Sequence, residues 1–400
     1  MAYVNKGATR VGDNVMTQVS LPALVLHQKA LEHNLRWMQN YADAHRALLA
    51  PHGKTTMTPA LFQRQLKQGA WGITLATAVQ SSVAYDHGVR RILMANQLVG
   101  EPNMAIIAGL LRQGGLEFHC LVENPDNVRA LARYFSAQDL QLNVMLEIGV
   151  AQGRCGCRTP EQIAAVLAAI KDSPALALTG IEGYEGVIHG DQPDRDIQQF
   201  AAYLVETAVL LQKQGLFDIP RPYVTASGSA WYDVIAEAFA HLQTSTLFTP
   251  LLRPGCYLVH DHGLYKNAQL GVLQRHSDMV TALQPAMEVW AQVQSLPESG
   301  CAIIALGKRD IAFDAGYPEP LRHYSAGTTS PEPQILDESY RVTAMMDQHA
   351  FLHIPDTHAL QVGDIIAFGA SHPCLTFDKW RQVSLVDDAL NVVEVMPTYF

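Results

Sequence analysis

The stretch EFHCLVENPDNVRALARYFSAQDLQLNVMLEI, residues 117–148, decides the fold because it contains one complete strand–helix–strand unit. Its two ends, 117–122 and 143–148, are short apolar runs of the kind that form buried strands. The segment 125–135 between them is amphipathic and opens with proline, which is common at the first position of a helix. The stretch therefore predicts two strands joined by a helix, as in a parallel sheet.

The same alternation continues on both sides of this unit. Six further runs are predicted as strands: 46–51, 72–76, 91–95, 176–184, 223–226 and 246–252. Further helices are predicted at 59–68, 160–171 and 194–214. Eight such units predict an α/β fold of the TIM-type (β/α)8 barrel class, whose usual size is about 250 residues. A doubly wound open sheet is the alternative, but no Gly-x-Gly-x-x-Gly turn marks a dinucleotide site.

The pattern changes after about residue 265. Short runs separated by Pro- and Gly-rich turns are predicted as strands at 279–283, 289–293, 301–305, 311–314, 341–345, 365–368 and 392–395. This spacing is typical of an antiparallel β domain. The run 21–27 is a spare strand that is expected to return to that domain. We therefore expect a barrel over 28–265 and a second, mostly antiparallel β domain built from 1–27 plus 266–400.

Composition restricts the possible partners. The chain has 400 residues, 48% hydrophobic and 16% charged, with a formal net charge of -10 and no long basic runs. Nucleic acids and anionic membranes bind clustered Lys and Arg, so neither is expected, and a small-molecule ligand is. The six cysteines form no disulfide framework, residues 1–14 lack an apolar signal region, and no apolar run could cross a bilayer. A cytoplasmic protein is expected.

A lysine just past the first predicted barrel strand is the first candidate site residue. It is Lys54, in the segment Pro51-His52-Gly53-Lys54-Thr55. Barrel enzymes build their active sites at the carboxyl ends of the strands, so this lysine faces the barrel mouth. Partial desolvation would lower its pKa and allow imine formation with a carbonyl cofactor, followed by proton abstraction at a substrate α-carbon. A solvated loop lysine is the competing interpretation.

Two short loops after the seventh and eighth strands are candidate phosphate sites. They are Thr225-Ala226-Ser227-Gly228-Ser229 and Arg253-Pro254-Gly255-Cys256-Tyr257. Barrels often bind phosphate at this corner, where small residues let backbone N–H groups reach the phosphate oxygens. Hydroxyl groups of Ser and Tyr add further donors. Either loop alone would be more simply explained as a turn.

A glycine-rich loop follows the fifth strand, at 149–157, and contains Arg154. Its glycines would let this arginine approach a flat ring closely, and a permanent charge beside a pyridine nitrogen would discourage ring protonation. A surface salt-bridging arginine is the simpler alternative. Cys155 and Cys157 in the same loop are more simply structural or incidental than metal ligands, because one Cys-x-Cys has no partners.

A pair of soft metal ligands lies near the carboxyl end, in Ser371-His372-Pro373-Cys374. In an extended segment residues i and i+2 face the same side, so the imidazole of His372 and the thiolate of Cys374 converge as zinc coordination requires. Two protein ligands leave positions for water and substrate, which suits a catalytic metal. The competing interpretation is a buried cysteine beside a hydrogen-bonded histidine.

Three of these motifs carry a family resemblance that extends from about residue 21 to residue 395. They are 51–55, Gln152-Gly153-Arg154-Cys155-Gly156, and Ser-His-Pro-Cys-x-Thr-Phe-Asp-Lys-Trp at 371–380. Together they resemble the metal-activated, pyridoxal-phosphate-dependent D-threonine aldolase and D-serine dehydratase family. The resemblance implies an alanine-racemase-like barrel of PLP fold type III with a β domain, in a homodimer.

The resemblance also implies roles for individual residues. Lys54 is similar to the Schiff-base lysine, and His189 is a weaker match to a histidine that acts on the substrate hydroxyl. His372 and Cys374 match the metal positions, with zinc preferred over manganese because thiolates select zinc. The expected cofactor-binding residues are Lys54, His52, Arg154, Tyr184, Thr225, Ser227, Gly228, Gly255, Cys256 and Tyr257.

The expected reaction has two versions. The aldolases usually carry Asp at the second metal position, whereas Cys374 is the dehydratase-like residue. However, Thr56-Met57 replaces the His-Lys pair that is common shortly after the lysine. We therefore expect a lyase that converts β-hydroxy D-amino acids such as D-serine or D-threonine to a 2-oxo acid and ammonia. The alternative is a retro-aldol cleavage to glycine and an aldehyde. A non-catalytic pyridoxal-phosphate carrier and an amino-acid racemase are the alternatives from other classes.

Overall fold

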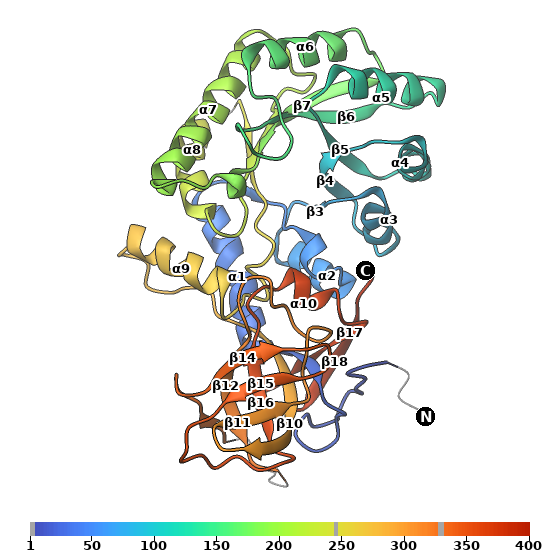
Figure 1. Cartoon of the computed structure of the whole chain (residues 1–400). Helices are drawn as coiled ribbons and strands as arrows, with labels where there is room; N and C mark the ends of the chain where they lie inside the picture. The colour runs from blue at the N-terminus through green and yellow to red at the C-terminus, as the bar shows by residue number, and fades with distance from the viewer. Residues whose placement is uncertain (1–4, 244–246, 327–331) are drawn as a thin grey trace. The chain divides into compact units, whose positions relative to one another are not determined.

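A computed structural model describes residues 5–243, 247–326 and 332–400 of the chain (Figure 1). The chain forms two compact units. We call the segments Met38–Lys54 and Leu61–Gly255 the barrel unit. The segments Met1–Trp37, Thr55–Ala60 and Cys256–Phe400 form the β unit.

The barrel unit contains an eight-stranded parallel sheet. Its strand order is β2-β9-β8-β7-β6-β5-β4-β3. The bounds are β2 Leu48–Leu49, β3 Ile73–Leu75, β4 Arg91–Gln97, β5 Glu117–Val122, β6 Leu142–Ile148, β7 Leu176–Gly183, β8 Tyr223–Ala226 and β9 Thr249–Leu252. The two end strands meet, because the N–H of Thr74 donates to the carbonyl of Pro51 at 2.9 Å. The predicted TIM-type barrel is confirmed.

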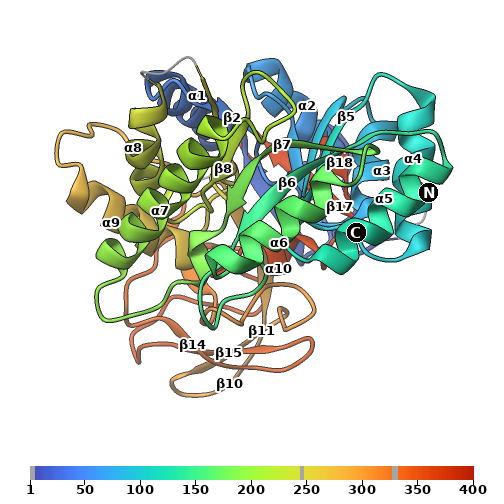
Figure 2. The same cartoon turned by 90° about the horizontal axis from the view of Figure 1, so that it is seen from above.

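Helices follow one another around the outside of this sheet (Figure 2). They are α3 Ala78–Asp86, α4 Glu101–Gln113, α5 Pro125–Ala137, α6 Pro160–Lys171, α7 Pro193–Lys213 and α8 Tyr232–Gln243. Two more, α1 Gln28–Ala44 and α2 Pro59–Gln68, contain residues of both units. Local sequence explains where they begin: Asn124 caps α5 and Thr159 caps α6, and each is followed directly by proline. The apolar faces of these helices pack on strands that are buried along nearly their whole length.

The β unit holds a ten-stranded, mostly antiparallel sheet. Its main path runs β13-β12-β16-β10-β1-β17-β18, and β11, β14 and β15 extend it from β10. The bounds are β1 Ala23–His27, β10 Met287–Glu298, β11 Cys301–Ile304, β12 Glu319–Tyr324, β13 Gln334–Ile335, β14 Arg341–Met345, β15 Ala350–His353, β16 Ile365–Gly369, β17 Gln382–Val386 and β18 Val392–Pro397. Two helices, α9 Leu264–Arg275 and α10 Cys374–Phe377, belong to the same unit. The spare early strand was correctly predicted, since β1 pairs with β10 and β17.

Two predicted strands are wrong. Residues 279–283 form no strand, and Val280 is 95% exposed, so its apolar character does not indicate burial. Residues 311–314 are also irregular, although Ile311 and Ala312 are buried. The N–H of Ala312 donates to the side chain of Thr376 and not to a neighbouring strand. The predicted strand 246–252 is observed from Thr249, and its first residue lies outside the described part.

Each unit has its own apolar core. In the barrel unit, a buried cluster gathers Trp71, Leu93, Leu121, Met145 and Leu251. The β unit packs Trp290 against Tyr324, with ring centroids 4.9 Å apart, in a cluster to which β1 and β16 also contribute. Across the described residues, none of the helices combines the length and the apolar character that a membrane crossing requires.

Candidate active site

Lys54 lies in a short 3-10 helix, Gly53–Thr55, that directly follows strand β2. Its side chain is half-buried. Gly53 is required at this turn, because a Cβ there would come within 2.7 Å of Ile73 and 2.8 Å of Phe62. Close packing of backbone against side chains therefore fixes the position from which Lys54 projects. This matches the expected location at the carboxyl end of a barrel strand.

His52 lies beside several cations of the barrel unit. Burial lowers its pKa well below the usual value, and the nearby charges of Lys54, Arg253 and Arg154 lower the pKa further. The imidazole is therefore neutral at physiological pH. Within the described residues, its buried Nδ1 has no hydrogen-bond partner. A group of three cations around a neutral imidazole fits an anionic cofactor such as pyridoxal phosphate.

The loop that carries Arg154 is tightly folded after strand β6. Gly156 has φ +101°, and a Cβ there would lie 2.3 Å from the backbone nitrogen of Gly149. Arg158 braces the same loop by donating to four of its backbone carbonyls. The guanidinium of Arg154 lies 4.4 Å from the ring centroid of Tyr184, a cation–π contact. Two residues predicted to flank the cofactor ring are therefore in contact with each other.

In the first predicted phosphate loop, two backbone N–H groups bind a glutamate side chain. The N–H groups of Ser227 and Gly228 donate to the carboxylate of Glu185 at 3.1 and 2.5 Å. Glu185 follows Tyr184 in a 3-10 helix, Glu185–Val187, and is fully buried. Burial raises the pKa of its carboxyl group. Two backbone N–H groups of this loop thus converge on the oxygens of one side chain, a donor arrangement that the predicted phosphate role requires.

The second predicted phosphate loop is divided between the units. Gly255 belongs to the barrel unit, where its N–H donates to the Ser229 hydroxyl at 3.0 Å. Cys256 and Tyr257 belong to the β unit, and both are buried. The structure thus joins the two loops of the barrel unit through Ser229.

A buried network inside the barrel was missed by the sequence reasoning. Arg253 donates to Thr225 at 2.9 Å, to the carbonyl of Gly183 at 3.0 Å, and to the carboxylate of Glu182. Burial raises the pKa of Glu182 and outweighs the opposite effect of Arg253. Burial and the charge of Glu182 also raise the pKa of Glu147 to about 8. The signal was present, because Glu147 and Glu182 interrupt otherwise apolar strands.

The predicted metal ligands both lie in the β unit, with partners of their own. The Cys374 thiol lies 3.5 Å from the Thr55 hydroxyl and 3.7 Å from the Cys256 sulfur. Hydrogen bonding from Cys256 is the largest cause that lowers the Cys374 pKa well below its ordinary value, and His372 contributes in the same direction. A lowered thiol pKa fits a metal site, since the thiolate is the ligand form.

His372 is held on its other side by a carboxylate. Its Nδ1 lies 2.7 Å from Oδ2 of Asp314. Hydrogen bonds to Cys374 and, to a lesser extent, Asp314 raise the pKa of His372 to about 9 despite partial burial. Over the described ranges, no group of three or more His, Cys, Asp and Glu side chains is arranged to hold a metal ion. The donor set that the residues offer is therefore the imidazole and thiolate pair.

His189, the predicted residue for the substrate hydroxyl, lies in an irregular segment after the 3-10 helix Glu185–Val187. Its side chain is exposed.

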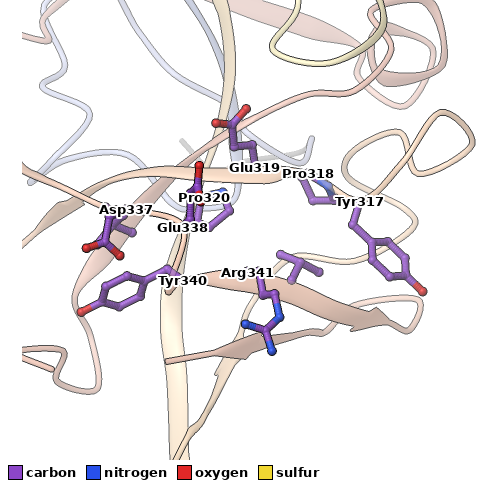
Figure 3. Close-up of a pocket in the computed structure, with 10 residues that line it drawn as sticks. Tyr317, Pro318, Glu319, Pro320, Asp337, Glu338, Tyr340 and Arg341 are labelled. Atoms are coloured by element: carbon purple, nitrogen blue, oxygen red, sulfur yellow. The ribbon is translucent and has the colours of Figure 1, made fainter. Parts of the chain in front are cut away.

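A separate surface pocket lies in the β unit, with a volume of about 440 Å³ (Figure 3). Tyr317 and Tyr340 lie at its opposite ends, and Glu319, Glu338 and Arg341 lie between them. Its lining includes none of the predicted site residues.

The fold is a parallel barrel with Lys54 after its first strand, together with a mostly antiparallel β unit. The chain belongs to the family of the alanine racemase N-terminal domain, whose model matches residues 26–261, more than half of its length. Residues 286–386 match a second model, the putative serine dehydratase domain. The resemblance found in the sequence motifs is confirmed.

Relatives of known activity match most of the chain. It is 25% identical to the D-threonine aldolase of an Arthrobacter species over 382 residues, covering 94% of this chain and 91% of that protein. It is 23% identical to the D-threo-3-hydroxyaspartate dehydratase of Delftia sp. strain HT23 over 378 residues, covering 91% and 93%. The structure of a D-threonine aldolase from Filomicrobium marinum is similar, with a TM-score of 0.81, 23% identity and 98% coverage of both chains. The expected class, a pyridoxal-phosphate-dependent lyase, is confirmed.

Proposed function

We propose that this enzyme is a lyase, dependent on pyridoxal phosphate and a divalent metal, that acts on β-hydroxy D-amino acids. Its main reaction is the dehydration and deamination of D-serine or D-threonine-like substrates to a 2-oxo acid and ammonia. The observation that carries this proposal is the side-chain hydrogen bond between His372 and Cys374 in the β unit. Relatives with aldolase and dehydratase activity support the substrate class.

All of the proposed cofactor residues except Cys256 and Tyr257 belong to the barrel unit. Pyridoxal phosphate provides a carbonyl for imine formation with amines and a ring that accepts electrons from a substrate α-carbon. Lys54 would hold its carbonyl, and Arg154 with Tyr184 would lie beside its ring. The phosphate would be held by the following residues: His52, Thr225, Ser227, Gly228, Gly255, Cys256 and Tyr257. Support comes from the N–H groups of Ser227 and Gly228, which already bind a carboxylate.

Lys54 would also act as the base. Its amine, once released by the substrate, takes the α-proton. The nearby charges of Lys54, Arg253 and Arg154, together with burial, lower the pKa of His52. Neutral His52 itself adds no further positive charge at this site.

The β unit supplies the proposed metal site. His372 and Cys374 would hold the ion, with zinc preferred over manganese because a thiolate is a soft ligand. A divalent ion acts as a Lewis acid toward a hydroxyl oxygen and makes hydroxide a better leaving group. A metal-free form of a D-threo-3-hydroxyaspartate dehydratase variant has been solved, which supports a metal role in a relative. Within the β unit, the Thr55 hydroxyl lies 3.5 Å from the Cys374 sulfur, so Thr55 is a neighbour of the proposed metal site.

Retro-aldol cleavage to glycine and an aldehyde is the second candidate. It is favoured by the similarity to D-threonine aldolase and by 26% identity to the 3-hydroxy-D-aspartate aldolase of Paracoccus denitrificans over 223 residues. In that reaction His189 would remove the proton of the substrate hydroxyl. Racemization and non-catalytic cofactor binding would give neither set of products.

The first test replaces the imine-forming lysine. Lys54→Ala is expected to lose the visible absorbance band of the bound cofactor and to reduce turnover at least about a thousandfold, because both imine formation and proton abstraction depend on this amine. Lys171→Ala, an exposed lysine in α6 of the same unit, is the matched control and should retain both. An unchanged absorbance band in Lys54→Ala would exclude the proposed role.

Product analysis separates the two reactions. D-Serine and D-threonine are incubated with the enzyme, with and without a chelator, and 2-oxo acid is measured against glycine. A 2-oxo acid that disappears after chelation and returns with Zn²⁺ supports the dehydratase. Cys374→Ala should keep the absorbance band and lose the metal-dependent turnover. Full activity after complete metal removal would contradict the metal role.

The domain and assembly assignments belong to the same proposal. Residues 28–265 would bind the cofactor, and residues 1–27 plus 266–400 would carry the metal ligands. We propose a homodimer, and light scattering after size-exclusion chromatography measures its mass. A mass near 44 kDa, that of one chain, would contradict it.

A further inference from the structure

The irregular loop after strand β11 is fastened to the segment that carries the proposed metal ligands. Asp314 meets the Nδ1 of His372 at 2.7 Å. The N–H of Ala312 donates to the Thr376 hydroxyl at 3.1 Å, and the indole N–H of Trp380 donates to the carbonyl of Asp310 at 2.8 Å. Three hydrogen bonds thus join residues 310–314 to residues 372–380 within the β unit.

Buried, hydrogen-bonded residues lie at both ends of this connection. Thr376 is fully buried and donates to the carbonyl of His372 at 2.9 Å while it accepts from Ala312. Asp310 is 1% exposed, and its carboxylate accepts from the N–H of Gly307 and from Lys6, both at 2.9 Å. The carboxylate of Asp314 is therefore presented from a packed loop, although its own side chain is 39% exposed.

The position of this carboxylate decides which nitrogen of His372 is available. A carboxylate accepts a hydrogen bond from a ring N–H, so Asp314 favours the form with its hydrogen on Nδ1. In the neutral ring, the form that binds a metal ion, the lone pair is then on Nε2. Metal-binding histidines commonly donate their other ring N–H to a carboxylate in this way, which fixes both the tautomer and the ring orientation.

We infer that Asp314 is a positioning residue that sets Nε2 of His372 as the metal-binding atom, and that the packed loop 310–314 holds it there. This inference deepens the proposed function, since it rests on the metal site at His372 and Cys374. Asp314 itself does not bind the metal. It acts through the orientation of His372.

The test measures binding of Zn²⁺ alone, by competition with a chromophoric chelator, on the purified full-length protein. Asp314→Ala is expected to weaken Zn²⁺ binding by about 10- to 100-fold, the usual effect of removing such a partner. Asp314→Glu should recover part of the loss because a carboxylate is restored. Asp347→Asn, an exposed carboxylate in the same unit, is the matched control and should bind Zn²⁺ as the wild type does.

A second readout separates positioning from a general loss of structure. Two-bond ¹H–¹⁵N spectra of the histidine rings report which nitrogen carries the hydrogen, and His372→Ala identifies the signal. Metal-free wild type, at a pH above the pKa of His372, should show the hydrogen on Nδ1. Asp314→Ala should show a mixture of both forms, at an unchanged unfolding temperature.

The possible outcomes distinguish this inference from the proposed function. If the wild type does not bind Zn²⁺, or if His372→Ala binds Zn²⁺ as well as the wild type does, both the metal role and the role of Asp314 are overturned. If the wild type binds Zn²⁺ through His372 and Asp314→Ala binds it equally well, only the role of Asp314 is overturned. A tautomer that does not change in Asp314→Ala would also overturn it.

Discussion

Two buried glutamates, Glu147 and Glu182, lie within the mostly apolar strands β6 and β7 of the barrel. Glu147 and Glu182 lie side by side on neighbouring strands, in register with each other. Gln97 donates to Glu147, and Arg253 donates to Glu182. Two buried carboxylates side by side resist ionisation. The stability of this part of the barrel therefore depends on protonation as well as on packing.

Replacing Glu147 should make the stability of the protein less dependent on pH. Its folded pKa of about 8 lies above its ordinary value of 4.5. As the pH rises from 4.5 to 8, the unfolded chain loses this proton while the folded protein keeps it, so the free energy of unfolding falls. Glu147→Gln does not titrate and can still accept the hydrogen bond from Gln97.

Urea unfolding of the cofactor-free protein at several pH values measures this effect. The variant should gain little over wild type near pH 4.5 and most above pH 8. Glu161→Gln, an exposed carboxylate in the first turn of α6, serves as the comparison. A gain that is equal at both pH values would show that Glu147 is ionised throughout.

Much of the site was predictable at the level of single residues. The location of Lys54 after the first barrel strand followed from strand spacing, and the contact of Arg154 with Tyr184 agrees with two roles assigned by resemblance. Partners distant in sequence were not predictable. Asp314 lies in a segment that the sequence suggested to be a strand, and only the fold brings it to His372, 58 residues later.

At the level of elements, local signals were reliable where the burial pattern was simple. Helices α2 and α6 begin and end where predicted, and so does strand β5. Strand β12 was missed because its charged residues resemble a loop. In the fold, Arg322 pairs with the buried Glu288, and His323 lies 2.7 Å from the buried Asp364. Tertiary pairing thus permits charges in a strand that the sequence alone does not reveal.

The start of helix α6 gives a test at this scale. Thr159 and Gln162 form a reciprocal capping box, each side chain accepting from the backbone of the other. Thr159→Ala should lower the free energy of unfolding by about 1 kcal/mol, because it leaves an N–H of the first turn without its partner. Thr159→Ser keeps the hydroxyl and should lie close to wild type in urea unfolding. Equal losses in both variants would contradict the capping role.

At the level of the whole molecule, the β unit depends on the first strand of the chain. β1 lies between β10 and β17, and its residues Leu24 to Leu26 are almost completely buried. The sequence predicted a strand at 21–27, before the first barrel unit, and its return to the β domain. Its place inside the sheet was not predictable, because strand order depends on contacts between distant segments.

Placing a charge in β1 should therefore destabilise the whole β unit. Val25→Asp buries a carboxylate without a partner and should cost about 3 kcal/mol or more. Val11→Asp is the matched control, since Val11 is 67% exposed and near the same end of the chain. Soluble yield and the urea midpoint measure the difference. Similar values for the two variants would contradict a central position for β1.

The position of β1 has a consequence for the order of events during synthesis on the ribosome. Val25 faces Glu288 on one side and Ser384 on the other, so its partners are translated about 260 and 360 residues later. The barrel strands, in contrast, pair mostly with the next strand to emerge. The apolar strand β1 can therefore pair on one side only after β10 has been synthesised, and on the other side only after β17. Until then it is exposed to chaperones and to aggregation.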